Sequence, residues 1–270
     1  YRAKHFVLAA GYTWTSHLLL LSACSRFPHG LANRSSGLVG RYMTGHNWVT
    51  AQMEVPYTIY PGMNETHALL SRQYFRCKPE DPYVRHDLRI WESSVGRQPR
   101  LRDGSGKLLL GDALMDDWKA RATSKGTARL RAYYDTHPDR ESRLTLDSTA
   151  KNRFGDPLPK IEHKLDAAAE ARTGATRQHI IQVFERIAKA NDGKLFAIED
   201  GGYQDHPGGG TRMGSNPTES VCDSYGRTHD HPNLFCVGAP TVPTGGCTNG
   251  TLTFVALTLR SADRLAEDRQ

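Results

Sequence analysis

Residues 4–11 read Lys-His-Phe-Val-Leu-Ala-Ala-Gly, and this stretch decides the fold class. A short apolar run that closes on glycine is typical of a buried strand in a parallel sheet, where both faces are covered. Thr15 and Ser16 follow it and introduce an apolar segment at residues 17–23, which we expect to be a capped helix. A strand that turns directly into a helix indicates an α/β fold.

The middle of the chain has a different character. Residues 49–60 alternate apolar and polar side chains, which is the pattern of a half-buried antiparallel strand. From residue 63 to residue 200 charges are frequent, with an alternating stretch at 141–146 and a helical one at 177–191. We interpret residues 63–200 as a separate, more solvent-exposed domain built on an antiparallel sheet, which makes the fold class α/β with an α+β part.

The last part of the chain returns to the chemistry of a core. A glycine-rich loop at 206–214 precedes a strand at 233–238, a loop at 239–249 and a helix at 251–267. Apolar residues recur in that helix every three or four positions, so we expect one of its faces to be buried. These residues are Leu252, Val255, Ala256, Leu259 and Ala262.

Composition narrows the functional classes. The 270 residues are 38% hydrophobic, which is enough to build a core. The net charge of +6 comes from Lys and Arg spread along the chain. Nucleic-acid binding usually shows a clustered basic footprint, so we expect no nucleic-acid partner.

The five cysteines are widely spaced, without a CxxC motif or the Cys-His spacing of a zinc site, so no metal site is predicted. No apolar stretch approaches the roughly 20 residues of a membrane helix, and we predict no transmembrane segment. The chain opens on a core strand without a signal peptide, so we expect further sequence before residue 1 in the complete protein. The compartment stays open between cytoplasm and periplasm.

Two segments carry residues suited to chemistry, and the first is the loop at 244–251, Thr-Gly-Gly-Cys-Thr-Asn-Gly-Thr. It stands directly before an apolar helix, whose free backbone N–H groups and dipole form a site for negative charge. Glycine-rich, threonine-capped loops are also common before helices that bind nothing. This segment alone therefore favours neither explanation.

The second segment is His206-Pro-Gly-Gly-Gly-Thr-Arg-Met-Gly214. Three glycines in a row let a backbone approach a flat or phosphorylated group closely, and a histidine beside them can move a proton near neutral pH. By itself, this pattern is explained better by a flexible surface loop.

Together the two segments resemble a family, the glucose-methanol-choline (GMC) oxidoreductases. That family has a motif H-x-x-G-T-x-R-M-G and, at the start of its last helix, a His or Asn in a segment like N-P-T-x-T. Here His206 opens the first motif and Asn249 opens Asn-Gly-Thr-Leu-Thr. Other segments follow in the family's order, at 6–11, 18–22, 37–41 with His46, 143–147, 154–157, 216–223 and 232–243.

The resemblance implies FAD as cofactor and an alcohol or sugar as the small-molecule substrate. It implies that His206 is the general base for the hydroxyl proton and that Asn249 holds the oxygen, while a hydride leaves for flavin N5. Cofactor contacts are implied at Ala10, Gly11, Gly238, Ala239, Gly250, Thr251 and Leu252. His46 is expected either near the cofactor or in a structural role, and Arg212 and Asp223 are expected to stabilise the fold, with Arg212 tying the glycine-rich loop to a carboxylate.

The resemblance also implies three domains. Residues 1–62 form part of a doubly wound FAD-binding domain, residues 63–200 a substrate-binding domain, and residues 201–270 the C-terminal part of the FAD-binding domain with the catalytic residues. The G-x-G-x-x-G segment that binds the ADP half of FAD is absent from the sequence. We therefore expect the chain alone to bind FAD poorly, and we expect a second chain or segment to carry that half.

The sequence departs from the family pattern at two positions. Gly210 stands where the family has Thr, and Gly250 stands where it has Pro, so local flavin contacts can differ. Asn at position 249 is more similar to the pyranose- and choline-oxidising branches than to glucose oxidase. Two alternatives stay open: a partner-dependent subunit of a split enzyme that is inactive alone, and a lyase on the same scaffold.

Overall fold

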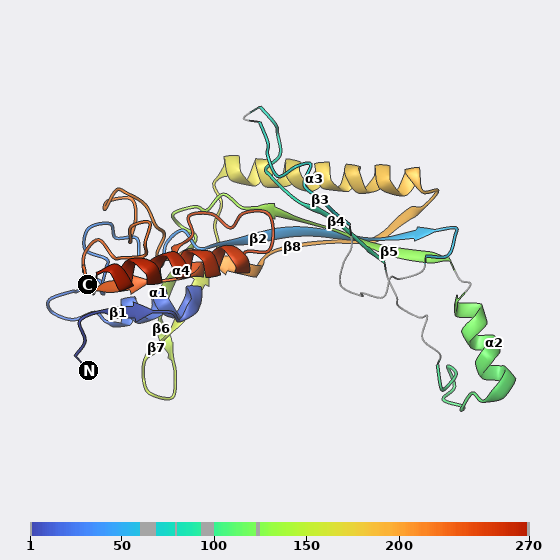
Figure 1. The fold of residues 1–270 in the computed structure, drawn as a ribbon, viewed down its shortest axis with the longest axis horizontal. Helices are drawn as coiled ribbons and strands as arrows, with labels where there is room; N and C mark the ends of the chain where they lie inside the picture. Colours follow the sequence, from blue (N-terminus) through green and yellow to red (C-terminus); the bar gives the residue numbers. More distant parts are fainter. Residues whose placement is uncertain (1, 60–68, 79, 93–99, 123–124, 269–270) are drawn as a thin grey trace. The chain divides into compact units, whose positions relative to one another are not determined.

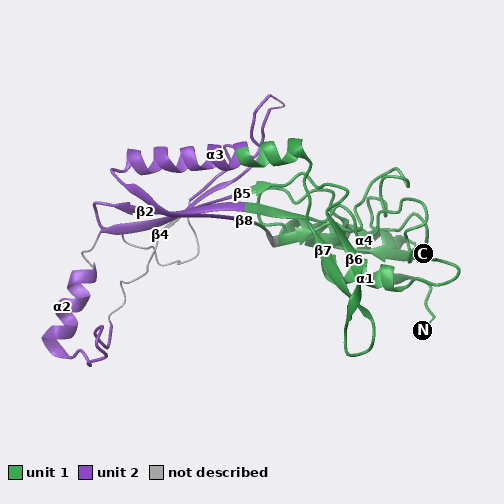
Figure 2. Cartoon of the chain, turned by 180° about the vertical axis from the view of Figure 1, so that it is seen from behind, with its two compact units in different colours: residues 1–47, 134–174, 202–270 green, residues 48–133, 175–201 purple. Residues whose placement is uncertain are grey.

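The computed structural model describes residues 2–59, 69–78, 80–92, 100–122 and 125–268. The chain divides into two compact units, coloured separately in Figure 2. Unit 1 comprises residues 1–47, 134–174 and 202–270, and unit 2 comprises residues 48–133 and 175–201. The unit boundary at 201/202 lies one residue from the predicted domain boundary at 200/201, and the predicted boundary at 62–63 lies outside the described residues. The assignment of a function to each domain stays a prediction.

Unit 1 contains a pair of parallel strands, β1 (Phe6–Leu8) and β9 (Leu234–Cys236), in which Phe6 pairs with Leu234 and Leu8 with Cys236. The predicted parallel strand at the start of the chain is therefore confirmed. The helix that follows, α1 (Gly11–Leu21), begins at Gly11, earlier than predicted. Thr15 and Ser16 do not cap it, because both lie fully buried inside the helix.

Two segments that were predicted to be buried, β1 and the apolar face of the last helix, are exposed within this chain. Val7 on β1 is 47% exposed, so its side chain is left largely uncovered by the described residues. On α4 (Thr251–Glu267) the predicted buried face is open, with Leu252 81% and Leu259 60% exposed. The helix packs through its other side, where Ser261 is buried.

Other parts of unit 1 enclose its core. Strands β6 (Arg143–Lys151) and β7 (Pro157–Glu162) form an antiparallel pair, and α1 packs against both of them and against the short 3-10 helix η1 (Ala239–Thr241). Buried side chains from α1, the loop at 32–39 and β9 meet in one hydrophobic cluster. It consists of Leu19, Ala32, Leu38, Val39, Val221, Leu234 and Cys236.

A five-stranded sheet has the order β3-β4-β5-β2-β8. Its strands are β2 (Thr44–Val55), β3 (Leu69–Ser71), β4 (Leu88–Glu92), β5 (Gly126–Asp135) and β8 (Lys194–Gly208), and the pairs β3-β4 and β4-β5 are antiparallel. The strand predicted at 49–60 corresponds to the second part of β2, and Tyr60 lies outside the described residues. The mixed α/β class with antiparallel sheets is thus confirmed.

Two further helices complete the elements (Figure 1). The first is α2 (Gly111–Ala122), and the second is α3 (Ala167–Ala190), which is longer than the predicted 177–191. The buried residues of α3 include Thr176, Ile180, Val183 and Phe184, which repeat at helical spacing. Among the described residues, no helix is long and apolar enough to cross a membrane.

Candidate active site

The structure brings the two predicted catalytic residues into contact. His206 stands near the end of β8, Asn249 stands just before α4, and the Asn249 Nδ2 and His206 Nε2 atoms are 3.3 Å apart. An amide nitrogen can only donate, so in this arrangement Nε2 of His206 is the acceptor and carries a lone pair. An imidazole lone pair and an amide N–H thus meet at one point, although the residues are far apart in sequence.

The backbone of His206 adopts a left-handed conformation, with φ of +48°. A non-glycine residue in this region is uncommon, because the conformation raises the free energy of the folded state by on the order of 1–3 kcal/mol. Residues with such strain cluster at functional sites. The strained residue is thus the one that contacts Asn249.

The glycines after His206 serve packing. A Cβ on Gly209 would overlap the Tyr42 carbonyl oxygen, one on Gly210 would overlap Ser16 Oγ, and one on Gly208 would lie 2.6 Å from Val242 Cγ2. The prediction that these glycines also give a flat group close access to the backbone stays a prediction. They allow the end of β8 to lie directly on neighbouring backbone and on α1.

His46 is buried beneath the pair. Its side chain is 0% exposed, and its ring centroid lies 5.1 Å from that of His206. Its Nε2 atom is 2.8 Å from the carbonyl oxygen of Gly245. Because a carbonyl only accepts, this nitrogen of His46 carries the hydrogen.

The predicted cofactor residues gather at one edge of the parallel strand pair. Ala10 and Gly11 follow β1, while Gly238 and Ala239 follow β9, so all four lie at the carboxyl ends of adjacent parallel strands. This edge is where ligands bind in open α/β sheets. The carbonyl of Ala239 also accepts from the N–H of Gly209, which connects this edge to the backbone just after His206.

Two helices begin at this region without a side-chain cap. Neither α1 nor α4 has a capping side chain or an acidic residue in its first turn. The first N–H groups of such a helix lack intrahelical partners and favour negative charge. Gly250, Thr251 and Leu252 form the start of α4 directly after Asn249.

Buried hydroxyl groups provide an independent check on whether a polar cofactor fits. Thr15, Ser16 and Thr44 are fully buried, and their hydroxyl oxygens have no hydrogen-bond partner within the described chain. Such groups are rare in folded proteins, because their desolvation is unfavourable. Because these hydroxyls are fully buried, with Ser16 packed against Gly210, they do not contact a cofactor directly. The groups that are placed to hold one are the uncapped starts of α1 and α4 and the carboxyl edge of β1 and β9.

The C-terminal part of the chain matches a known protein family. Residues 138–258 match the family model described as GMC oxidoreductase, and the match includes both His206 and Asn249. The chain carries a C-terminal GMC oxidoreductase region.

Named relatives and a solved structure agree with this. The chain is 33% identical over 273 residues to the fructose dehydrogenase large subunit of Gluconobacter japonicus, a match that covers 98% of the chain and 48% of that protein. It is 28% identical to paromamine 6'-oxidase of Streptomyces fradiae, covering 99% of the chain and 46% of the relative. The crystal structure of pyridoxine 4-oxidase from Mesorbium loti has the same fold, with a TM-score of 0.58, 16% identity and coverage of 97% and 51%. The chain thus spans about half the length of these proteins.

The structure accounts for one departure from the GMC motif. A Cβ on Gly250 would lie 2.6 Å from Cζ of Phe254, so the Phe254 ring fills the space that the family's proline would need. Asn249 and Gly250 also line a cavity of about 360 Å³ together with Met213, Phe254 and Arg260. The GMC asparagine therefore stands at the wall of a cavity.

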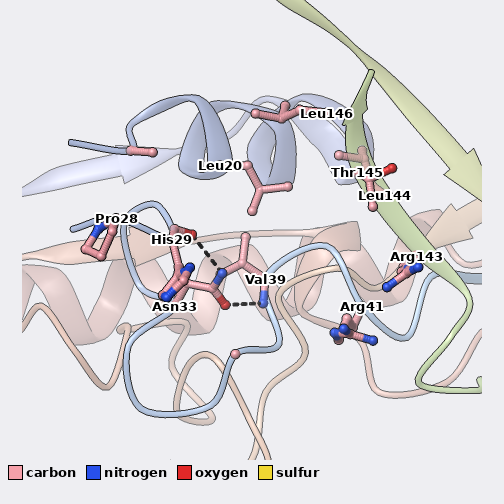
Figure 3. Close-up of a pocket in the computed structure, with 12 residues that line it drawn as sticks. Leu20, Pro28, His29, Asn33, Val39, Arg41, Arg143, Leu144, Thr145 and Leu146 are labelled. Carbon is pink, nitrogen blue, oxygen red and sulfur yellow. Dashed lines mark hydrogen bonds between the residues drawn. The ribbon is translucent and has the colours of Figure 1, made fainter. Parts of the chain in front are cut away.

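A second cavity of about 350 Å³ lies in unit 1 and shares no lining residue with the first (Figure 3). Leu20, Val39 and Leu146 give it apolar walls, and Arg41 and Arg143 stand at one side. Both guanidinium groups pair with Glu141, at 2.6 Å and 3.5 Å. Their positive charge is thereby partly neutralised at a partly exposed site.

Arg212 and Asp223 stabilise loops. Arg212 donates to the carbonyl of Glu219 and lies 3.7 Å over the ring of Tyr42, so the expected carboxylate partner is replaced by a carbonyl and a ring. Asp223 accepts from the N–H groups of Tyr225 and Arg227 in a turn. Among the described residues, no cluster of His, Cys, Asp and Glu is arranged to hold a metal ion.

One residue beside the pair was missed by the sequence analysis. Asp135, the last residue of β5, accepts a hydrogen bond of 3.0 Å from the N–H of Gly246. Asp135 is not part of a motif, and the residues around it give no indication that it contacts Gly246, which follows far along the chain.

Proposed function

We propose that the protein to which this chain belongs oxidises an alcohol or sugar hydroxyl with FAD as cofactor. The observation that carries the proposal is the 3.3 Å contact between His206 and Asn249 within the GMC region. The names of the relatives, a fructose dehydrogenase subunit and a paromamine oxidase, support a substrate rich in hydroxyl groups.

In this proposal the substrate hydroxyl lies where the imidazole and the carboxamide meet. When the hydroxyl enters, it replaces the Asn249 N–H at the lone pair of His206 Nε2. Nε2 then accepts the hydroxyl proton as general base, which contributes roughly 10²- to 10⁴-fold to the rate. The Nδ2–H of Asn249 donates to the hydroxyl oxygen and stabilises the negative charge that develops there. FAD supplies the hydride acceptor, flavin N5, when it is bound.

The cofactor would be held by the surfaces around the pair. Ala10, Gly11, Gly238 and Ala239 stand at the carboxyl edge of β1 and β9, and backbone N–H groups of Gly250, Thr251 and Leu252 begin α4. These N–H groups favour the negative charge of a reduced flavin. The ADP half of FAD needs a G-x-G-x-x-G segment, which the sequence does not contain.

Anaerobic mixing of the complete, FAD-loaded protein with sugars and small alcohols tests this function. Oxidation of a substrate removes the visible absorbance of the flavin, and we expect this loss with at least one sugar or polyol. A lyase on the same scaffold would convert its substrate with the flavin absorbance unchanged, and that result would contradict the proposal.

A second candidate is a partner-dependent subunit, active only with a chain or segment that carries the nucleotide-binding half. The open apolar face of α4, with Leu252 and Leu259, and the exposed Phe6 and Val7 of β1 favour it, because such surfaces usually pack against something. Under this candidate the purified chain shows no flavin absorbance with added FAD and gains it on mixing with such a partner. Full flavin binding by the chain alone would exclude it.

A further inference from the structure

One peptide group beside the catalytic pair is held at both of its polar atoms by side chains. The carbonyl oxygen of Gly245 lies 2.8 Å from Nε2 of His46, and the N–H of Gly246 donates to Oδ1 of Asp135 at 3.0 Å. These two backbone groups belong to the same peptide unit. His46 comes from β2 and Asp135 from the end of β5, so two strands hold the same peptide.

The surrounding backbone leaves this peptide little freedom. A Cβ on Gly245 would lie 2.6 Å from the carbonyl oxygen of Gly45, so the loop packs directly against the start of β2. Gly246 has φ of +74°, a left-handed conformation that suits glycine. Rotation of the peptide would break both hydrogen bonds at once, and the bond to the Asp135 carboxylate is of the stronger, charge-assisted kind.

The Gly245–Gly246 peptide, held in this clamp by His46 and Asp135, lies close to Asn249 in sequence and is linked to His206 through His46. Asn249 follows Gly246 in the same loop, and the ring of His46 lies 5.1 Å from that of His206. A shift of this loop therefore changes the distance between the Asn249 amide and the His206 imidazole.

We propose that Asp135 is a positioning residue, which fixes the Gly245–Gly246 peptide against His46 and thereby holds Asn249 at its distance from His206. The catalytic part of this inference rests on the proposed function, whereas the clamp itself does not. Because misplacement of a reacting group by about 1 Å can cost on the order of 10²-fold in rate, loss of the clamp should lower kcat more than it changes KM.

The test compares Asp135→Ala and Asp135→Asn in the complete, FAD-loaded protein, with Asp147→Ala as the matched control. Asn keeps an oxygen that can accept from Gly246, whereas Ala does not. Asp147 likewise accepts from backbone N–H groups in unit 1, those of Thr149 and Ala150, but in the β6 strand. The first readout is hydrogen exchange at the Gly246 amide, and the second is the split between kcat and KM.

We expect Asp135→Ala to speed exchange at Gly246 roughly tenfold or more and to lower kcat on the order of 10- to 100-fold, with Asp135→Asn restoring most of both. Unchanged exchange at Gly246 in Asp135→Ala overturns the clamp. If Asp135→Ala exchanges faster at Gly246 but keeps its kcat, while Asn249→Ala has a lowered kcat, the positioning role of Asp135 is overturned. If Asn249→Ala is itself as fast as the unaltered protein, the proposed function of Asn249 fails, and the exchange data still decide the clamp.

Discussion

Asn249 contributes a single amide N–H to the pair, and this allows a sharp prediction at the scale of one residue. Asn249→Ala removes the donor that faces His206 Nε2. A hydrogen bond to a group that gains charge contributes about 1.5–3 kcal/mol, so the rate of flavin reduction by substrate should fall roughly 10- to 100-fold. Asn191→Ala, which removes an asparagine at the end of α3 in unit 2, is the control and should leave the rate unchanged. Equal rates for the two variants would contradict the role of Asn249.

The sequence was sufficient to select His206 and Asn249 as candidates, because the two motifs together resemble one family, and the structure brings the two side chains into contact. It was not sufficient to find Asp135, because a carboxylate that binds one backbone N–H far along the chain leaves no local pattern. The packing role of the triple glycine was also missed. Glycines that admit a ligand and glycines that admit the Tyr42 carbonyl have the same sequence, and only the packing distinguishes them.

At the scale of elements, the end of β8 depends on close packing by Gly209. A Cβ there would overlap the backbone of Tyr42, and the residue has φ of +81°. Gly37 offers a matched control, since it has φ of +65° but nothing within 4 Å of an added Cβ. We expect Gly37→Ala to lower the free energy of unfolding by about 1 kcal/mol through strain alone, and Gly209→Ala by roughly 1–3 kcal/mol more through overlap.

Urea unfolding of the two glycine variants measures this difference. Equal losses in Gly37→Ala and Gly209→Ala would show that the end of β8 has room for a side chain, and the packing explanation would then fail.

Helix boundaries were predictable where the local signals were clear. The range predicted for the last helix coincides with α4 (Thr251–Glu267), because the polar Asn249-Gly250-Thr251 sequence precedes a strongly amphipathic segment. The start of α1 was predicted too late, because Thr15 and Ser16 were taken for caps although tertiary packing buries them inside the helix. Which face of α4 is buried could not be inferred from periodicity, since an apolar stripe does not say what covers it.

At the scale of the whole molecule, a buried histidine makes stability depend on pH. His86 is 0% exposed, and its ring stacks on Tyr74 at 4.6 Å between ring centroids. Burial is the main cause that lowers the pKa of His86 from 6.5 to about 4, and repulsion from His179 contributes to this, while the hydrogen bond to the Val84 carbonyl acts in the opposite direction. The unfolded chain therefore binds a proton at a higher pH than the folded one. Stability is lost as the pH falls from above 6.5 toward 4, and this group adds no further loss below that value.

The shift corresponds to a loss of roughly 3 kcal/mol in the free energy of unfolding. His86→Phe keeps a ring against Tyr74 but cannot titrate, so we expect its stability to fall less than that of the unaltered protein between pH 7 and pH 4. Urea unfolding at several pH values measures both proteins. Parallel pH profiles would contradict a neutral, buried His86.

The proposed function depends on His206 acting as the base of a flavin-dependent oxidation. The rate constant of flavin reduction under anaerobic conditions tests this role most directly. In the complete, FAD-loaded protein, His206→Ala should lower that rate constant roughly 10²- to 10⁴-fold at neutral pH, while His229→Ala should leave it unchanged. A His206→Ala protein that retains its flavin and is reduced as fast as the unaltered protein would contradict the assignment.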